Sequence, residues 1–230
     1  MPVSLRLISS MATKALLADL AQAYRAVAPE VTLVIESVGG VDAARRVQAG
    51  EAFDAVVLAS DAIDKLGAAG HVQPGTRVDL VRSGIWVAVP AGTAPPDIRS
   101  EDAVRAAVLA APSIGYSTGP SGVYLQQLFE RWGIADVVAS RTVQARPGNP
   151  VGGLVAQGEV ALGFQQLSEL MNLPGIQLLG PLPPAIQQIT TFSGAVAATS
   201  TQPDAVRALL AWCASPATAA LKQRHGMESA

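Results

Sequence analysis

The chain has 230 residues, 50% of them hydrophobic, and its formal net charge is −2. This composition is sufficient for the buried core of one or two globular domains. The small net charge argues against nucleic acid or an anionic membrane surface as a partner. No apolar run reaches the roughly 18–20 residues of a membrane-spanning helix. We therefore expect a globular protein with no integral membrane segment.

Residues that commonly bind metals are scarce. Cys213 is the single cysteine, so the chain forms no internal disulfide and holds no cysteine-based metal cluster. The two histidines, His71 and His225, lie far apart in the sequence, and we find no nucleophile motif that would complete a Ser-His-Asp triad. The sequence predicts neither a metal site nor a cofactor. The first residues lack the pattern of a signal peptide. We expect a periplasmic location if a leader has been removed, and otherwise a cytoplasmic one.

The first part of the chain alternates short apolar runs with amphipathic segments. Strands are predicted over residues 3–8, 31–36 and 53–58, and helices over about 14–27, 41–49 and 62–69. Such alternation predicts a mostly parallel sheet with helices on both faces. The third run is almost entirely apolar, as expected of a strand that is buried on both faces.

Each of these predicted strands is followed by a turn that contains serine. Because ligands bind beyond the carboxyl ends of the strands in open α/β sheets, we expect these serines at one edge. A single serine at such a place is usually a helix N-cap, and it is the convergence of several that indicates a binding site. The residues concerned are Ser9, Ser10, Ser37 with the following Gly39, and Ser60.

The second part of the chain follows the same plan. The extended run 78–90 is long enough to leave one lobe and enter another, and the run 189–198 is expected to return. Between them, strands are predicted over 113–116, 141–145, 161–164 and 176–179, with helices over 100–110, about 151–157 and from 165 onward. Terminal helices are predicted over 203–212 and 215–225.

A glycine-rich turn joins the strand at 113–116 to an amphipathic helix. A helix that begins near Pro120 leaves its first backbone N–H groups unpaired, and glycines allow a ligand to approach the backbone closely. This arrangement suits an anion, although the same residues also occur in ordinary tight turns. The turn lacks the Lys-Ser/Thr pair of a P-loop and the glycine spacing of a dinucleotide site. Its candidate ligand residues are Tyr116, Ser117, Gly119, Ser121 and Gly122.

Five segments together resemble a known family. They are Ser9–Ser10 and the runs 36–40, 49–57, 116–122 and 155–163. On these the chain resembles the type II periplasmic-binding-protein fold, in the molybdate-binding-protein-like branch of bacterial extracellular solute-binding proteins. The resemblance implies an α/β fold with two lobes, about 1–81 plus 194–230 and 82–193, joined by two crossing strands. It also implies a monomer that clamps a small anion in its cleft and delivers it to an ABC-transporter permease.

The resemblance also implies which residues bind the anion. Molybdate-binding proteins hold the oxyanion with hydroxyl and backbone N–H groups and with a tyrosine late in the chain. Ser9 or Ser10 matches the contact from the turn after the first strand, and Ser37 matches the contact from the turn after the second strand. The contacts from the second lobe map near Ser121 and Val151. The late tyrosine is missing, because residues 163–166 read Gly-Phe-Gln-Gln. This departure argues against molybdate.

A related group of proteins resembles aconitate isomerase, an enzyme that has the same fold and whose substrate is a tricarboxylate. Residues 119–122 and the pair Gln165–Gln166 fit that group. Arg82, at the first crossing, and Arg146, in a turn with Asn149, could each bind a carboxylate bidentately or could equally be solvated surface charges. Isomerisation also needs a base. Glu36, Asp61 and Tyr116 are candidates by position, but none stands out, so the catalytic residues stay unknown.

Two functional hypotheses follow. The first, which we favour because the fold is most often used in this way, is a solute-binding protein for a small anion such as molybdate or an organic carboxylate. The alternative is an isomerase of small unsaturated carboxylic acids. An effector-sensing domain of a transcription regulator is disfavoured, because no DNA-binding segment is attached.

Overall fold

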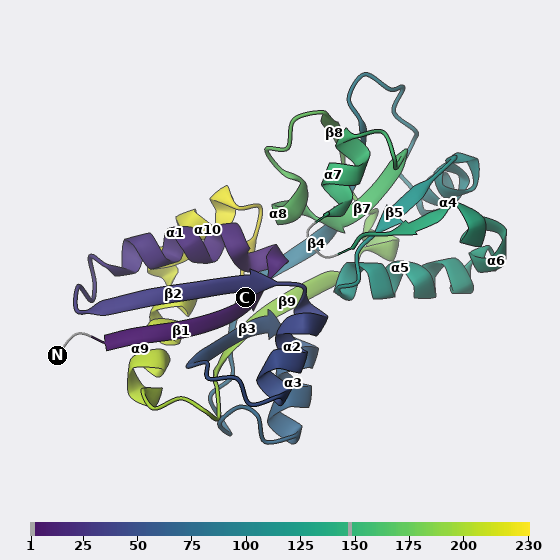
Figure 1. The fold of residues 1–230 in the computed structure, drawn as a ribbon. Coiled ribbons are helices and arrows are strands. Elements are labelled where there is room, and N and C mark those ends of the chain that lie inside the picture. Colours follow the sequence, from purple (N-terminus) through teal and green to yellow (C-terminus); the bar gives the residue numbers. More distant parts are fainter. Residues whose placement is uncertain (1–2, 147–148) are drawn as a thin grey trace. The chain divides into compact units, whose positions relative to one another are not determined.

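The computed structural model describes residues 3–146 and 149–230. The chain divides into two compact units. The first unit comprises Met1–Ser83 and Thr190–Ala230, and the second comprises Gly84–Ile189. Both units contain a sheet flanked by helices, so the predicted α/β class is confirmed (Figure 1). Within the described residues, no helix is both long enough and apolar enough to cross a bilayer.

The first unit is built on three parallel strands. These are β1 (Val3–Ser10), β2 (Val31–Val38) and β3 (Ala55–Ala59), with β1 in the middle. The later part of β9 (Ile189–Val196) pairs antiparallel with β3, and the start of β4 (Val78–Pro90) pairs with β10 (Glu228–Ser229). All five residues of β3 are buried, as its apolar sequence predicts.

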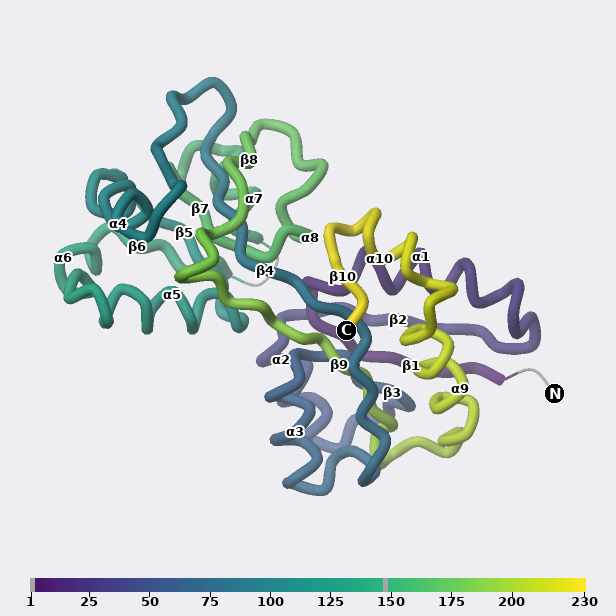
Figure 2. Tube along the Cα trace, turned by 180° about the vertical axis from the view of Figure 1, so that it is seen from behind, coloured from purple at the N-terminus to yellow at the C-terminus, as the bar shows by residue number. Residues whose placement is uncertain are grey.

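Helices cover both faces of this sheet. One face packs against α1 (Lys14–Tyr24), α9 (Pro203–Ala214) and α10 (Ala219–Arg224), so the C-terminal helices return to the first part of the chain (Figure 2). The other face packs against α2 (Gly40–Gln48) and α3 (Ser60–Ala68). Short 3-10 helices lie at Met11–Thr13 and Pro216–Thr218. These elements place the starts of α2 and α3 at the carboxyl ends of β2 and β3.

The second unit has a mixed sheet. Strand β5 (Ile114–Tyr116) lies between β6 (Thr142–Gln144) and β7 (Leu162–Gln166) and pairs parallel with both. The latter part of β4 pairs antiparallel with β7 and with β8 (Ile176–Pro181). The carboxyl ends of β5, β6 and β7 therefore meet at one edge.

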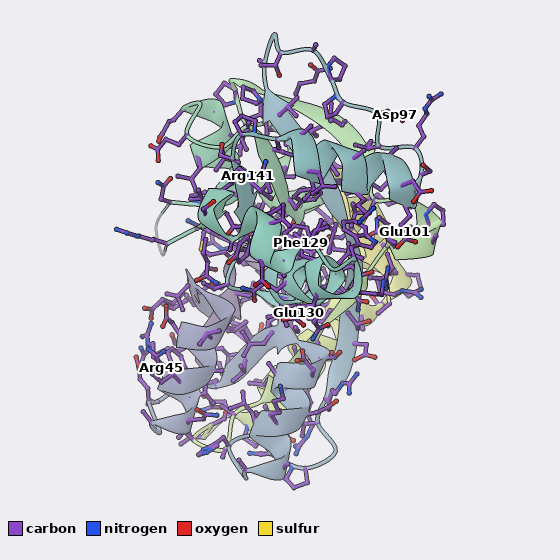
Figure 3. The ribbon with its side chains drawn as sticks, turned by 90° about the vertical axis from the view of Figure 1, so that its right-hand side faces the viewer. Arg45, Asp97, Glu101, Phe129, Glu130 and Arg141 are labelled. Atoms are coloured by element: carbon purple, nitrogen blue, oxygen red, sulfur yellow. The ribbon has the colours of Figure 1, made fainter. Side chains whose placement is uncertain are left out.

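Two hydrophobic clusters hold the second unit together. The larger one lies among the sheet, α4 (Glu101–Ala110), α5 (Pro120–Arg131) and α6 (Ala135–Val138). The smaller one includes α7 (Val151–Ala156), which packs beside α8 (Leu167–Leu170). Helix α5 shows the expected amphipathic pattern, since Phe129 is buried while its neighbour Glu130 is exposed (Figure 3). The 3-10 helices of this unit are Ala139–Arg141 and Pro184–Ile186.

One predicted boundary is wrong. A helix was expected from Gln165, but Gln165 and Gln166 are the last residues of β7, and α8 begins at Leu167. The strand continues because Gln165 and Gln166 pair with Trp86 and Ile85 of β4. This pairing partner lies about eighty residues earlier in the chain, so local periodicity could not reveal it.

Candidate functional site

Two hydroxyl groups meet at the carboxyl edge of the first unit. Ser9 on β1 is aligned with Ser37 on β2, and their Oγ atoms lie 2.7 Å apart. Ser9 is completely buried and Ser37 is half-buried. Because a hydroxyl both donates and accepts, either serine can be the donor. The two predicted site residues are thus brought together, as expected from adjacent parallel strands.

Ser10 presents a different situation. It is 8% exposed, and its Oγ has no hydrogen-bond partner among the described residues. A Cβ built on Gly40 would lie 3.8 Å from the Cβ of Ser10, which places Ser10 against the first turn of α2. The first N–H groups of a helix have no partner within the helix, and they carry a partial positive charge. A buried hydroxyl without a partner beside such a helix end is an arrangement that a bound anion would complete.

Gly39 and Ser60 mark the starts of the two helices that point toward this edge. Gly39 is the N-cap of α2, and its carbonyl accepts the Ala43 N–H. Ser60 is the first residue of α3, where it is half-buried. Neither helix start is capped by a side chain. Their first N–H groups are therefore available to a ligand.

Glu36 belongs to an ion-pair network with Arg46 and Glu51. Arg46 donates to both oxygens of Glu36, at 2.5 and 3.0 Å, and to both oxygens of Glu51, at 2.6 and 2.7 Å. The guanidinium also lies 5.2 Å from the ring centre of Phe53. The hydrogen bonds from Arg46 hold the pKa of Glu36 below its ordinary value. A carboxylate with a lowered pKa is a weak base, so this geometry indicates a structural role for Glu36.

The glycine-rich turn of the second unit is organised by Ser117. The Ser117 Oγ accepts the backbone N–H of Gly119 at 3.2 Å and lies 3.1 Å from the Ser121 Oγ. Gly119 is the N-cap of α5, and Ser121 is buried in the first turn of that helix. A Cβ built on Gly122 would overlap the Ser117 carbonyl oxygen. Only glycine fits at position 122, because the turn passes directly over the helix start.

Tyr116 packs into the core of the second unit. Its ring belongs to the larger hydrophobic cluster, and its hydroxyl accepts a hydrogen bond from Gln126 Nε2 at 3.1 Å. Asp61, the remaining candidate base, is an exposed residue that pairs with Lys65 at 3.6 Å. These contacts are those of a packed aromatic ring and of an exposed ion pair.

The two candidate arginines differ in their surroundings. Arg82 is exposed in the first unit, and its side chain donates to the Ser229 carbonyl oxygen at 3.1 and 3.4 Å. Arg146 is exposed in the second unit, just after β6, and its side chain has no partner among the described residues. Arg146 therefore keeps all its donors available, whereas Arg82 holds the C-terminal strand. Residues 147 and 148 of the predicted turn lie outside the described residues.

Three further candidates gather around α7. Asn149 is half-buried just before the helix, and Val151 is its first residue and is buried. Gln165 is 2% exposed at the end of β7. Its Oε1 accepts the Gly152 N–H at 3.4 Å, and its Nε2 donates to Glu169 Oε1 at 2.8 Å. The predicted residues of the second unit thus lie at the carboxyl ends of its parallel strands.

Glu169 was not identified from the sequence. Burial raises the pKa of its carboxyl group to about 7, and the hydrogen bond from Gln165 offsets only part of this effect. In the sequence it reads as an ordinary helix-surface glutamate, because its surroundings come from α7 and β7 rather than from its neighbours along the chain. Among the described residues, no three His, Cys, Asp or Glu side chains are grouped so that they could hold a metal ion.

Comparison with known proteins identifies the family. The sequence profile described as "Bacterial extracellular solute-binding protein" matches residues 5–228. The chain belongs to this family. It is also 41% identical over 184 residues to an aconitate isomerase from Pseudomonas sp., a match that covers 80% of this chain and 70% of that relative.

Solved structures confirm the fold. The periplasmic molybdate-binding protein of Azotobacter vinelandii superimposes with a TM-score of 0.79 at 19% identity, covering 97% of this chain and 98% of that one. The sulfate-binding protein SubI from Mycobacterium tuberculosis gives a TM-score of 0.79 at 18% identity, covering 98% and 86%. The expected kinship with molybdate-binding-like proteins and their two-lobed fold is therefore confirmed. These two relatives are named for different ligands, so the fold does not specify the ligand.

Proposed function

We propose that the chain binds a small anion with the hydroxyl and backbone N–H groups at its strand ends, as a solute-binding protein that serves a transporter permease. The observation that carries this proposal is the buried Ser10 Oγ at the first turn of α2, which has no hydrogen-bond partner in the part of the chain that the structure describes. Leaving a buried polar group unpaired costs about 1–3 kcal/mol, so a ligand that accepts its hydrogen would remove this cost. The family's description favours the periplasmic location among the two expected, and we expect a monomer.

The charges around the first unit's edge support recognition by uncharged donors. Both arginines of α2 are already ion-paired, Arg45 with Asp42 and Arg46 with Glu36 and Glu51. The groups left for a ligand are the Ser10 hydroxyl and the first N–H groups of α2 and α3. Such donors suit a fully ionised oxyanion or carboxylate, because they neutralise the charge through dipoles.

Among small anions, we propose an organic carboxylate as the ligand. The exposed Arg146 offers an unoccupied guanidinium, whose planar donors match a carboxylate in a bidentate geometry. The missing late tyrosine argues against molybdate, and the relative at 41% identity is named for an enzyme of a tricarboxylate. These three observations favour the same class of ligand.

The test is a thermal-shift screen of the purified chain, followed by calorimetry. The panel contains molybdate, tungstate, sulfate, phosphate, citrate, and cis- and trans-aconitate. A ligand at a hundred times its dissociation constant stabilises the folded state by about 2.7 kcal/mol, which moves the melting temperature clearly. We expect the carboxylates to do so. A shift with molybdate or tungstate alone would overturn the choice of carboxylate, and no shift with any anion would overturn anion binding itself.

A second candidate function is isomerisation of a small unsaturated carboxylic acid. The specific observation in its favour is the 41% identity to an aconitate isomerase over 80% of this chain. The reaction removes a proton from one carbon beside a carboxylate and returns a proton at another carbon, so the atoms balance without a co-reactant. The chain would be incubated with trans-aconitate in D₂O and followed by NMR. Conversion to the cis isomer with deuterium incorporation would support the enzyme, and binding without conversion would exclude it.

A further inference from the structure

Glu169 is a partly buried acid that has no cation as a partner among the described residues. It lies on α8, and its Oε1 accepts a hydrogen bond from Gln165 Nε2 at 2.8 Å. The oxygen of the same Gln165 amide, Oε1, accepts the Gly152 N–H at 3.4 Å. A Cβ built on Gly152 would lie 3.5 Å from the Glu169 carbonyl oxygen, so α7 packs closely on α8. The carboxyl group and the Gln165 amide therefore form one hydrogen-bonded unit under the start of α7.

This unit lies at the edge where the second unit's candidate anion groups gather. Strands β5 and β7 pair with Ile114 beside Leu162 and Gly115 beside Gly163. Continuing this register places Gln165 level with Ser117, at the glycine-rich turn. Adjacent strands lie about 4.8 Å apart, so the Glu169 carboxyl group, bonded to Gln165, lies at the same edge of the sheet as that turn.

Among the described residues of the elements packed on α8, no charge offsets a negative charge on Glu169. Neither α7 nor β7, the elements packed against α8, contains a titratable or charged residue. The charged residues on the segments that flank them are Arg146 and Glu159, and both side chains are exposed to solvent, where water screens their charges. The state of Glu169 is thus governed by its burial and by any anion bound nearby.

We propose that anion binding by the second unit is coupled to the uptake of one proton by Glu169, which acts as a positioning residue through Gln165. This inference rests on the proposed anion binding. An anion at the glycine-rich turn repels an ionised Glu169, whereas a protonated Glu169 carries no charge and still bonds to the Gln165 amide. The proton is taken from solvent on binding and is returned when the anion leaves.

The ionisation of the free protein favours such a coupling. Because burial raises the pKa of Glu169 to about 7, both forms of the carboxyl group are populated near neutral pH. Anion affinity should therefore fall as the pH rises, since the ionised form dominates at higher pH. If only the protonated form binds the anion, affinity follows the protonated fraction of Glu169, which falls from about nine-tenths at pH 6 to about one-tenth at pH 8. We therefore expect a decrease of about tenfold in affinity between these two pH values.

The experiment is calorimetry of trans-aconitate binding at pH 6, 7 and 8, in pairs of buffers with different ionisation enthalpies. It compares the unmodified chain with Glu169→Gln and with Glu159→Gln, a matched control on an exposed glutamate of the same unit. The protonation of free trans-aconitate is the same in all three experiments. Its contribution to the pH dependence of binding therefore cancels when the proteins are compared. We expect Glu169→Gln to bind at pH 8 about as tightly as the unmodified chain does at pH 6, without the extra proton. Glu159→Gln should behave like the unmodified chain.

The outcomes separate this inference from the proposed function. If trans-aconitate binds and Glu169→Gln shows the same pH dependence and proton uptake as the unmodified chain, the coupling is wrong and anion binding stands. If no anion of the screen binds, both fail together. Should Glu169→Gln not fold, the Glu169 carboxyl carbon can be titrated by NMR in the unmodified chain. Its pKa must rise when trans-aconitate is added, and an unchanged or lowered value would overturn the coupling.

Discussion

The Oγ atoms of Ser9 and Ser37 lie 2.7 Å apart on adjacent parallel strands, while the Oγ of the next residue, Ser10, has no hydrogen-bond partner within residues 3–146 and 149–230. The first two hydroxyls therefore stabilise the free protein by bonding to each other. Removing either one would change the folded state and the site together. Ser10 is different, since its hydroxyl forms no hydrogen bond with any of the described residues. This contrast allows binding to be tested separately from folding.

Ser10→Ala should weaken anion binding without weakening the fold. Loss of a hydrogen bond to a charged ligand costs about 1.5–3 kcal/mol, or roughly ten- to a hundred-fold in affinity. Removing a buried hydroxyl that has no partner should leave the free energy of unfolding unchanged or raise it by about 1 kcal/mol. Urea unfolding and calorimetry with trans-aconitate measure the two effects. Ser4→Ala, at an exposed position of the same strand, is the control and should change neither.

The opposite pattern would contradict this role for Ser10. If Ser10→Ala unfolds more readily and binds trans-aconitate with unchanged affinity, then the hydroxyl has a structural partner and does not contact the anion. Ser9→Ala is informative as a comparison, because it breaks the bond to Ser37. It should lose about 0.5–1.5 kcal/mol of stability, the usual net value of one hydrogen bond.

Gly122→Ala should disrupt the start of α5. Its Cβ would overlap the Ser117 carbonyl oxygen, so either the turn or the helix must move. We expect a loss of about 3 kcal/mol or more in the free energy of unfolding, as for severe overpacking. Gly119→Ala is the matched control, since its Cβ would make an ordinary contact of 3.5 Å with the Ser117 Oγ. Urea unfolding measures the loss of unfolding free energy in both variants. Comparable losses would show that the overlap at position 122 does not cause the destabilisation of Gly122→Ala.

The serine-bearing edge of the first unit could be predicted because its determinants are local. Each strand there is a short apolar run, each turn carries serine or glycine, and each helix follows at once. Parallel order then brings Ser9 beside Ser37 without any further information. The glycine-rich turn was likewise recognisable, and the overlap that a Cβ at Gly122 would cause explains why a glycine stands there.

The environments of individual charges could not be predicted, because they depend on contacts between distant segments. Glu36 is a candidate base by its position in the sequence, but in the structure its carboxylate accepts from Arg46, which also binds Glu51. The sequence gives no signal for Glu169, because its pKa depends on packing against α7 and β7. Sequence periodicity indicates which face of an element is buried. It does not indicate which polar group on that face lacks a partner.

Cys213 should be unreactive in the folded protein. It is 3% exposed, and burial raises the pKa of its thiol to about 12, while Lys222 opposes this only in part. Since the thiolate is the reactive form, only about one thiol in ten thousand is reactive at pH 8. Ellman's reagent should label Cys213 at the rate at which the first unit opens, and rapidly in urea. Fast labelling of the folded chain would show that the thiol is accessible.

Lys222 should destabilise the fold at neutral pH. It is 1% exposed, and its Nζ has no hydrogen-bond partner among the described residues. Burial lowers the pKa of its amine below the ordinary value of 10.5, and Cys213 counteracts this in part. Below the folded pKa, the amine is charged in both states, so the full cost of burying the charge is present. Between the folded pKa and 10.5, the unfolded chain binds more protons, so stability rises with pH in this window.

Lys222→Met tests this, because it keeps the length of the side chain and removes the amine. We expect the variant to be more stable than the unmodified chain by about 1–3 kcal/mol at pH 7, the cost of an unpaired buried polar group. The advantage should shrink as the pH approaches 10.5, because the unmodified chain then buries a neutral amine. Urea unfolding at pH 7, 8, 9 and 10 measures the difference. The control is Lys65→Met on α3, whose side chain is 79% exposed and should give no such trend. A constant difference across this range would mean that the Lys222 amine is solvated in the folded protein, and its burial would then carry no electrostatic cost.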